Sequence, residues 1–361
     1  MAKEHIGELD TVRGLAFAAV VMQHAIGIFN QRGGFTDTDR WVVAGIFNLV
    51  KFAVPTFVFI SGLVLFYNYF DGLDYRRFLG KRFREIIIPY LVWSLFYTLY
   101  YLRAWPVSGE FYSSLARNVL LGKAGYHLWY IVMIMQFYIL FPLWLYVFRQ
   151  ITGNLQTRPG IGIIVAVAVL IYLVMTWWSF SGRIYASPCL PEKLVQYRDR
   201  NFLFWYIYFL GGGLLGLNIE KMRRWVMKAA VPALPVMGIL LVFLTWEISQ
   251  GSDRLNLALA TSLRPSMTLF TIASITVVLA LTIRLGKARL LDSFGRHSLG
   301  GYLVHAVILN YAANFIVSVT PGMGVLIRIF LTFIIALFLS WAFSSIVSRF
   351  SWGRYLVGVP K

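Results

Sequence analysis

The sequence predicts an all-α membrane protein, a polytopic bundle of about ten transmembrane helices. Of its 361 residues, 59% are hydrophobic and only 13% are charged, a composition typical of integral membrane proteins rather than of soluble domains. Apolar stretches long enough to cross a bilayer recur along the whole chain. We therefore expect a single transmembrane domain over residues 1–361, without a soluble domain.

The predicted spans follow one another in ten apolar stretches. They are 12–30, 41–67, 86–102, 128–148, 161–178, 202–217, 229–247, 267–283, 299–317 and 323–347. A helix needs about 20 apolar residues to cross the hydrocarbon core. The second and last stretches exceed that length, which allows tilt, and Pro55 and Gly62 offer break points in the second.

The distribution of basic residues predicts the orientation. The net charge of +18 would suggest a nucleic-acid partner in a soluble chain, but here Lys and Arg gather at the termini and in the loops on one side. Basic residues favour cytoplasmic loops, so we expect both termini in the cytoplasm. The first ten residues are mixed in charge and resemble no cleavable signal. Cys189 stands alone, which excludes an intramolecular disulfide or a multi-cysteine metal site.

The first span contains three ionisable residues on one face. Arg13 and His24 are eleven residues apart, which at 100° per residue is about 20° past three full turns, and Asp10 falls on the same face. Polar groups inside a bilayer cost several kcal/mol unless they are partnered, so these residues are functional candidates. The alternative is that His24 is a structural histidine that ties two helices together.

A basic loop follows the second span. Lys81, Arg82 and Arg84 lie at its predicted cytoplasmic surface, where guanidinium groups suit the phosphates of a ligand. Basic loops beside a membrane are also common topogenic and headgroup-binding signals.

Two further segments carry polar groups toward the outer side. Lys51 lies deep in the second span and needs a carboxylate, carbonyl or water partner, unless its side chain snorkels to the interface. His127 and Trp129 open the fourth span, where they belong either to the aromatic belt or to a platform on which sugars stack.

The ninth span carries Tyr302 and His305 on one face, and these residues could converge with His24 in the bundle. The glycines at 211–213 and 216 predict close helix packing. We find no phosphate-binding Gly-rich loop, no His pair four residues apart and no Gly-x-Ser-x-Gly elbow. Few carboxylates lie in the spans, which argues against a proton pump built on acidic relays.

Four motifs in series resemble the integral-membrane acyltransferase 3 family over essentially the whole chain. They are Leu9-Asp10-x-x-Arg13-Gly14 with His24, Val54-Pro55 through Ser61-Gly62, His127-Leu128-Trp129-Tyr130, and Ser298-Leu299-Gly300-Gly301-Tyr302-Leu303-x-His305. The segments from Leu121 to Phe137 and from Ile88 to Tyr90 look most like the branch that acylates exported polysaccharides, including poly-N-acetylglucosamine and enterobacterial common antigen.

The resemblance implies a multi-pass enzyme of the bacterial inner membrane. Such an enzyme moves an acetyl or succinyl group from cytoplasmic acyl-CoA to a hydroxyl of a cell-surface polysaccharide or lipid-linked sugar. Acyl-CoA is then a donor substrate rather than a bound cofactor, and we expect no metal. Membrane lipid and a polysaccharide synthase or export machinery are the further partners expected, and nucleic acid is not one of them.

The implied site residues fall into three groups. The catalytic group is His24 as general base with Arg13, Asp10, Tyr302 and His305, the donor-binding group is Lys81, Arg82, Arg84 and Arg13, and the acceptor-binding group is Lys51, His127 and Trp129. Tyr302 or His305 could donate a hydrogen bond to the thioester oxyanion. A covalent acyl-histidine route stays open, and Arg13 could instead be a structural partner of Asp10.

This sequence departs from the family pattern at three positions. Lys81-x-x-Arg84 replaces an Arg-x-x-Arg, Glu85 stands where a second Arg is expected, and Gln136 replaces a frequent Glu. Two other functions remain open. A polysaccharide or lipid-linked sugar transporter would perform no chemistry, and a structural partner in a synthase complex would tolerate Leu or Phe at position 24.

Overall fold

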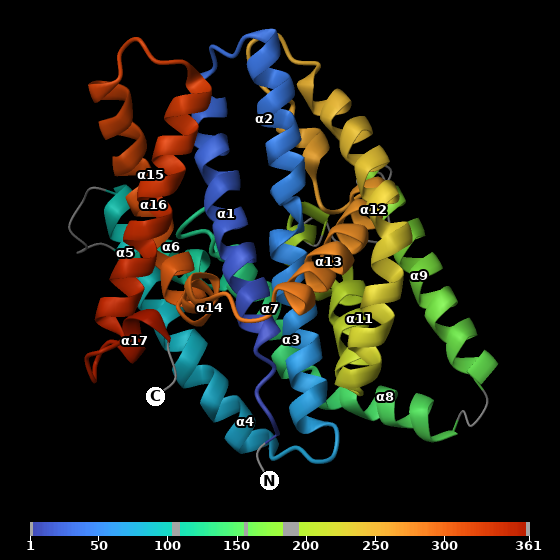
Figure 1. Cartoon of the computed structure of the whole chain (residues 1–361). Coiled ribbons are helices and arrows are strands. Elements are labelled where there is room, and N and C mark those ends of the chain that lie inside the picture. Colours follow the sequence, from blue (N-terminus) through green and yellow to red (C-terminus); the bar gives the residue numbers. More distant parts are fainter. Residues whose placement is uncertain (1–2, 103–108, 155–157, 183–194, 359–361) are drawn as a thin grey trace. The chain divides into compact units, whose positions relative to one another are not determined.

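The computed structural model describes residues 3–102, 109–154, 158–182 and 195–358, which are helices joined by turns and loops, without a strand among them (Figure 1). The chain forms two compact units. The first comprises Met1–Phe57, Arg223–Ser262 and Ser266–Lys361, and the second comprises Val58–Met222 and Leu263–Pro265.

The first unit contains the N-terminal and C-terminal helices. Those that lie wholly or mainly in it are α1 (Glu8–Arg32), α2 (Asp37–Leu49), the 3₁₀ turn η1 (Val50–Phe52), α12 (Ile219–Ser249), the 3₁₀ turn η6 (Leu257–Ala260), α13 (Pro265–Leu285), α14 (Arg289–Arg296), α15 (Ser298–Val319), α16 (Val325–Val347) and α17 (Arg354–Val357).

The second unit contains the middle of the chain. The helices that lie wholly or mainly in it are α3 (Ala53–Tyr69), α4 (Tyr75–Arg82), the π-helix η2 (Phe83–Ile87), α5 (Ile88–Leu102), α6 (Gly109–Leu121), α7 (Trp129–Ile139), α8 (Phe141–Asn154), α9 (Arg158–Phe180), the 3₁₀ turns η4 (Arg198–Arg200) and η5 (Phe202–Phe204), and α11 (Tyr206–Gly216).

Membrane spans are recognised by length and apolar composition. Among the described residues, 6 helices are long and apolar enough to cross a bilayer, or up to 7 if α7 and α8, which bend by 50°, count as one span. Each of the ten predicted stretches is helical over most of its length. The apolar helix Tyr206–Gly216 is too short to span alone, so the count of ten and the orientation stay predictions.

Prolines explain the irregular turns. Pro55 has no N–H to donate to the carbonyl of Lys51, and the 3₁₀ turn η1 lies directly before it, close to the break point predicted there. Pro89, which likewise has no N–H, lies just after the π-helix η2. Pro142 lies in the first turn of α8, just after the 50° bend between α7 and α8. Gly62, the other predicted break point, lies inside α3 as a packing position.

Helix α1 is the centre of the first unit. It contacts α2, η1, α14, α15 and α16, and Figure 1 shows it running beside α2 on one side and α15 and α16 on the other. Phe17, Val21 and Phe29 of α1 are at most 2% exposed and belong to one apolar cluster with Phe294 of α14 and Leu309 of α15. Inside a bilayer, close van der Waals packing of such side chains holds helices together, so the first unit is organised around α1.

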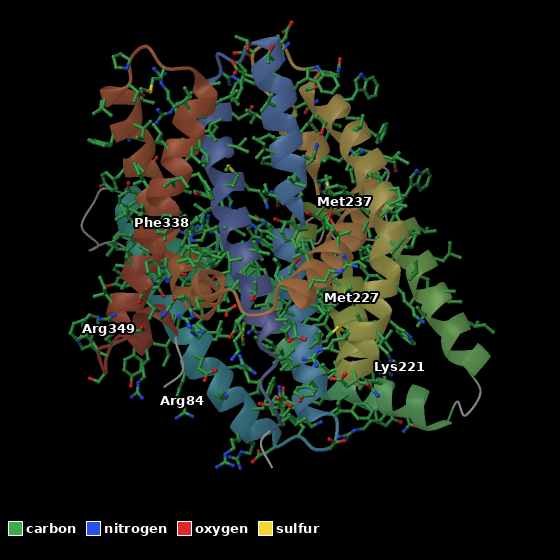
Figure 2. All side chains as sticks on the ribbon, viewed as in Figure 1. Arg84, Lys221, Met227, Met237, Phe338 and Arg349 are labelled. Carbon is green, nitrogen blue, oxygen red and sulfur yellow. The ribbon has the colours of Figure 1, made fainter. Side chains whose placement is uncertain are left out.

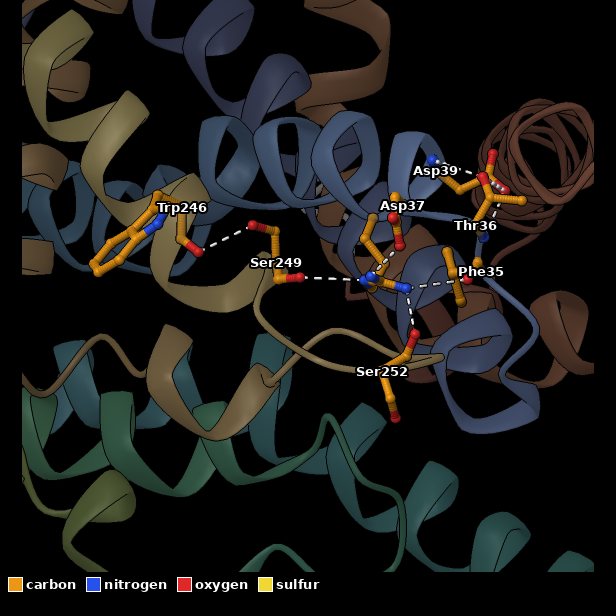
Figure 3. A network of polar contacts seen from close by, with 8 residues as sticks. Phe35, Thr36, Asp37, Asp39, Trp246, Ser249 and Ser252 are labelled. Atoms are coloured by element: carbon orange, nitrogen blue, oxygen red, sulfur yellow. Dashed lines mark hydrogen bonds and ion pairs between the residues drawn. The ribbon is translucent and has the colours of Figure 1, made fainter.

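A polar clamp holds the loop between α12 and α13 against the ends of α1 and α2 (Figure 3). Arg40 donates to the carbonyls of Ser249 (3.2 Å), Phe35 (3.3 Å) and Ser252, and it pairs with Asp37. The Asn30 amide donates to the Leu255 carbonyl at 3.2 Å and accepts from the Leu255 N–H at 2.7 Å. These bonds satisfy loop backbone groups that no helix pairs.

Close backbone contacts join α3 and α11 in the second unit. An added Cβ at Gly62 would lie 2.0 Å from the Phe209 carbonyl oxygen, and one at Gly212 would lie 1.9 Å from that of Phe59. An added Cβ at Gly216 would lie 2.4 Å from the Leu63 carbonyl oxygen, and one at Gly213 would lie 2.6 Å from the Phe66 ring, whereas one at Gly211 meets nothing within 4 Å. The close helix packing predicted for this glycine run is confirmed for Gly212, Gly213 and Gly216.

Candidate active site

The ionisable stripe lies on one continuous helix. Helix α1 has 25 residues, with Glu8 and Asp10 in its first turn, where negative charge is stabilised by the helix dipole. Arg13 and His24 are eleven positions apart in unbroken helix, which is about 16 Å along the axis. The helix therefore presents Asp10 and Arg13 at one end and His24 in its middle.

Asp10 is the buried centre of the charged end. Its side chain is 8% exposed and accepts from Nη1 of Arg13 at 2.9 Å and from Nε2 of His5 at 2.9 Å. The side chain of Arg13 is 28% exposed. Arg13 thus has the structural partner considered above and also keeps accessible N–H groups that can bind an anion.

Two further contacts fix this end of α1 to other helices of the first unit. Glu8 accepts two hydrogen bonds from Arg223 of α12, at 2.7 and 3.2 Å, and Thr11 donates to Asp292 of α14. An added Cβ at Gly14 would lie 2.1 Å from the Leu291 carbonyl oxygen of α14. The glycine that follows Arg13 in the motif is therefore required by direct backbone packing.

The imidazoles of His24 and His305 come together. Their ring centroids are 5.2 Å apart with an angle of 34° between the planes. His24 keeps part of its surface accessible, whereas His305 is 0% exposed. Nδ1 of His305 lies 2.5 Å from the carbonyl oxygen of Tyr302, whose ring lies 5.7 Å from the His305 ring. The structure thus brings together three of the five residues of the predicted catalytic group.

Two glycines explain this convergence. The Phe17 ring lies where a Cβ of Gly301 would be, 2.5 Å away, so α1 and α15 approach closely at that level. Gly300 faces Ser344 of α16 and Val357 of α17 instead. His305 lies one turn beyond Gly301, and His24 lies two turns beyond Phe17. The glycine pair in the last motif therefore positions α15 between two neighbours and places its histidine against α1.

Lys51 lies in the 3₁₀ turn between α2 and α3, within electrostatic reach of His24. Its ammonium is 5.3 Å from the centroid of the Phe47 ring. No ion pair joins it to a carboxylate in the part of the chain that the structure describes. Gln23, beside His24, donates to the Val50 carbonyl at 2.6 Å and holds the turn against α1. Sequence reasoning missed Gln23, although an amide inside a span signals an interhelical hydrogen bond.

The basic loop belongs to the second unit. Arg82 stacks on Phe78 and Tyr138, 5.3 Å from each ring centroid, and lies 3.5 Å from Glu85. Lys81 is half exposed and 3.9 Å from Glu85. Arg84 is exposed, and Figure 2 labels it beside the ribbon of this segment. Lys81 and Arg84 are therefore accessible to a phosphate, whereas Arg82 is largely engaged in packing.

His127 and Trp129 also lie in the second unit. His127 is 2% exposed and meets the rings of Tyr97 and Tyr126 edge to face, at centroid distances of 5.2 and 5.4 Å. Trp129 is partly buried beside Trp205, at 5.5 Å between centroids. His127 is thus enclosed by aromatic rings, and Trp129 is the more accessible of the two predicted acceptor contacts.

Gln136 fixes the segment before α11, a role that sequence reasoning missed. Its amide nitrogen donates to the Arg200 carbonyl at 2.6 Å, and its amide oxygen accepts from the Phe202 N–H at 3.3 Å. Nε of Arg200 in turn donates to the Leu121 carbonyl at 2.6 Å. An amide provides both a donor and an acceptor, which a carboxylate cannot do.

The Gln136→Glu variant is accordingly expected to destabilise the protein by about 1–3 kcal/mol, because the Arg200 carbonyl loses its donor and faces a carboxylate. Thermal unfolding in detergent measures this effect. The same change at the exposed Gln250, which bonds only the Trp246 carbonyl in the described structure, is the control. Equal unfolding temperatures for the two variants would contradict this role.

Comparison with known proteins gives one family. A family model described as an acyltransferase domain matches residues 6–355. A Staphylococcus aureus protein (strain Mu50) named "Probable poly-beta-1,6-N-acetyl-D-glucosamine export protein" is 25% identical over 365 residues, 97% of this chain and 95% of the relative. A Bacillus subtilis protein named "Putative membrane-bound acyltransferase YfiQ" is 25% identical over 376 residues, 98% and 94% of the two chains. No solved structure matches the chain.

Proposed function

This chain belongs to the acyltransferase-domain family, and from that premise we propose that it transfers an acetyl or succinyl group from acyl-CoA to a hydroxyl of a cell-surface polysaccharide or lipid-linked sugar. The observation that carries the proposal is the pair of imidazoles, because an accessible His24 beside a buried His305 provides a positioned base inside a helical membrane protein. A general base is the group that acyl transfer to a hydroxyl requires.

The reaction is a direct transfer. His24 takes the proton of the sugar hydroxyl while the hydroxyl oxygen attacks the thioester carbonyl carbon. The tetrahedral intermediate then expels the CoA sulfur, which receives the proton from His24, so that an ester and free CoA thiol result. Lys51 lies within electrostatic reach of His24, and its positive charge stabilises the oxyanion or holds the acceptor.

The donor and acceptor contacts complete the proposal. In the second unit, Lys81 and Arg84 are the proposed contacts of the CoA phosphates and Trp129 offers a ring to the sugar. In the first unit, Arg13 is the candidate cation for the donor. The acceptor class rests on the names of the staphylococcal relatives, which mention poly-beta-1,6-N-acetyl-D-glucosamine.

We place the enzyme in the bacterial inner membrane with ten spans and both termini in the cytoplasm. Support comes from the helical state of all ten apolar stretches and from the gathering of basic residues on one side. Labelling of single cysteines introduced into the loops of a Cys189→Ser background, from either side of the membrane, tests this topology.

Removal of the accessible cations is expected to weaken donor binding. Lys81→Ala combined with Arg84→Ala should raise KM for acyl-CoA about tenfold, because each charge-assisted hydrogen bond contributes about 1.5–3 kcal/mol before solvent screening. The matched control is Arg76→Ala with Arg77→Ala, the same charge change on exposed residues of α4. An unchanged KM for acyl-CoA, or an equal effect of the control pair, would show that the loop does not bind the donor and would leave it only a role in membrane topology.

A transporter of polysaccharide or lipid-linked sugar is the second candidate, because several relatives are named export proteins. Purified protein mixed with radiolabelled acetyl-CoA or succinyl-CoA and poly-N-acetylglucosamine fragments or lipid-linked sugars separates the two. Label on a sugar supports the enzyme. Sugar movement into vesicles without label transfer supports the transporter and rejects the enzyme.

A further inference from the structure

The break between α2 and α3 is tied to α1 by one hydrogen bond. The carbonyl of Val50, in the 3₁₀ turn η1, accepts from the N–H of Ala53 and from Nε2 of Gln23, the latter at 2.6 Å. A carbonyl oxygen has two lone pairs, and these two bonds use both of them. Gln23 directly precedes His24 in α1, and Val50 directly precedes Lys51. The bond therefore joins the two backbones beside the proposed base and the proposed cation.

This bond fixes the backbone at Lys51. The carbonyl of Val50 and the N–H of Lys51 belong to one planar peptide group, so a bond to the carbonyl also sets the direction in which the chain continues into Lys51. Support from within the helix is weakened at this point. Pro55 has no N–H, and the carbonyl of Lys51, four residues before it, lacks its usual α-helical donor. Gln23 thus supplies from α1 a restraint that the broken helix does not provide.

The side chain of Lys51 is directed by a second contact. Its ammonium lies 5.3 Å from the centroid of the Phe47 ring, a cation–π distance, and Phe47 is buried in the apolar cluster around α1. Among the described residues, no carboxylate forms an ion pair with this ammonium. The ammonium lies within electrostatic reach of His24. Gln23 therefore holds the backbone of Lys51 and Phe47 holds its charged end, while the charge itself is not neutralised by an acid.

From these contacts, and on the basis of the function proposed above, we infer that Gln23 is a positioning residue that holds Lys51 at its working distance from the reacting atoms beside His24. Gln23 acts through Lys51 rather than on the substrate. Its amide keeps η1 against α1, so that the ammonium is in place before the sugar hydroxyl attacks the thioester and the oxyanion forms. A preorganised charge of this kind stabilises the transition state without moving during the reaction, and a displacement of about 1 Å can cost about 100-fold in rate.

Substitutions at positions 23 and 51, alone and together, test this inference. Gln23→Met keeps the length of the side chain and removes the donor, Gln23→Asn withdraws the amide by one carbon, and Lys51→Met removes the charge. Asn30→Leu is the matched control, because it removes another interhelical amide of α1, the one that bonds Leu255. Purified proteins are compared by transfer from radiolabelled acetyl-CoA or succinyl-CoA to poly-N-acetylglucosamine fragments or lipid-linked sugars, and by the unfolding temperature in detergent.

We expect Gln23→Met and Gln23→Asn to lose about 10-fold in kcat/KM for the acceptor. The loss should appear in the same parameter, kcat or KM, that Lys51→Met changes, with KM for acyl-CoA unaltered. Lys51→Met should lose about 100-fold, and Gln23→Met added to it should cost nothing more, because the two residues act as a unit. Asn30→Leu should lower the unfolding temperature, and its effect on kcat/KM should be the same with and without Lys51.

An equal loss from Gln23→Met in the presence and in the absence of Lys51 would overturn the inference, because Gln23 would then act on the structure alone. Wild-type kinetics in both folded position-23 variants, wild-type kinetics in Lys51→Met, or failure of both position-23 variants to fold would overturn it as well. Absence of transfer by the wild type would instead overturn the proposed function, which keeps the two failures distinct.

Discussion

The His24→Ala variant is expected to insert into the membrane, fold and lose acyl transfer by a factor of about 10² to 10⁴, the range that a general base contributes. His24 is partly accessible, whereas its neighbour His305 is 0% exposed and cannot meet a substrate directly. His305 therefore cannot replace His24 as the base. The measurement is turnover of radiolabelled acetyl-CoA onto a sugar acceptor by purified protein.

A second variant separates chemistry from packing at the same position. His24→Phe keeps a ring between α1 and α15 and so preserves the ring contact with His305, which lies 5.2 Å from His24 between centroids. If His24 only ties two helices together, the Phe variant should work nearly as well as the wild type. Our proposal expects it to be as inactive as the Ala variant, at an unchanged unfolding temperature. Normal turnover in either variant would reject His24 as the base.

The Gly14→Ala variant is expected to destabilise the first unit by about 1–3 kcal/mol and to reduce activity with it. The new Cβ would lie 2.1 Å from the Leu291 carbonyl oxygen and 3.2 Å from the Gly295 nitrogen, and both are backbone atoms that no rotamer change can move. Helix α14 must shift away from α1, which disturbs the bond between Thr11 and Asp292 and the surroundings of Arg13.

Helix α1 also provides the matched control. A Cβ at Gly27 meets nothing within 4 Å, so Gly27→Ala makes the same chemical change in the same helix without a clash. Alanine has the higher helix propensity, and this variant should therefore be as stable as the wild type or about 0.5–1 kcal/mol more stable. Unfolding temperatures in detergent and turnover compare the two. If Gly14→Ala unfolds at the wild-type temperature, direct backbone packing is not what position 14 requires.

Local periodicity predicted much of this site. The spacing of Asp10, Arg13 and His24 predicts one helical face, and α1 is unbroken over all three. Tyr302 and His305 likewise share a face of α15. Periodicity along a helix does not determine which helices touch. The contact between His24 and His305 depends on the packing of Phe17 against Gly301. This is a long-range contact, which the spacing of residues along one helix does not predict.

The basic loop and the outer aromatic segment were less predictable for a different reason. Single-sequence patterns place Arg82 among three cations, but its contacts with Phe78, Tyr138 and Glu85 depend on tertiary neighbours. The sequence pattern predicts a place for His127 in the interfacial aromatic belt or in a sugar platform, whereas in the structure His127 is only 2% exposed. The number of spans was difficult for a similar reason, because short helices such as α11 cannot be assigned as spans from length alone.

Helix α1, the centre of the first unit, also sets an order for biosynthesis. Its partners α14, α15 and α16 are all translated long after it, and the bond between Thr11 and Asp292 joins residues 281 positions apart. While the ribosome is still making the middle of the chain, α1 has neither the backbone face of α14 nor the imidazole of α15 beside it. Closing a loop of this length costs entropy that only the finished contacts recover. We therefore expect prematurely terminated chains that end before α15 to be inactive in acyl transfer, even where their first helices have entered the membrane.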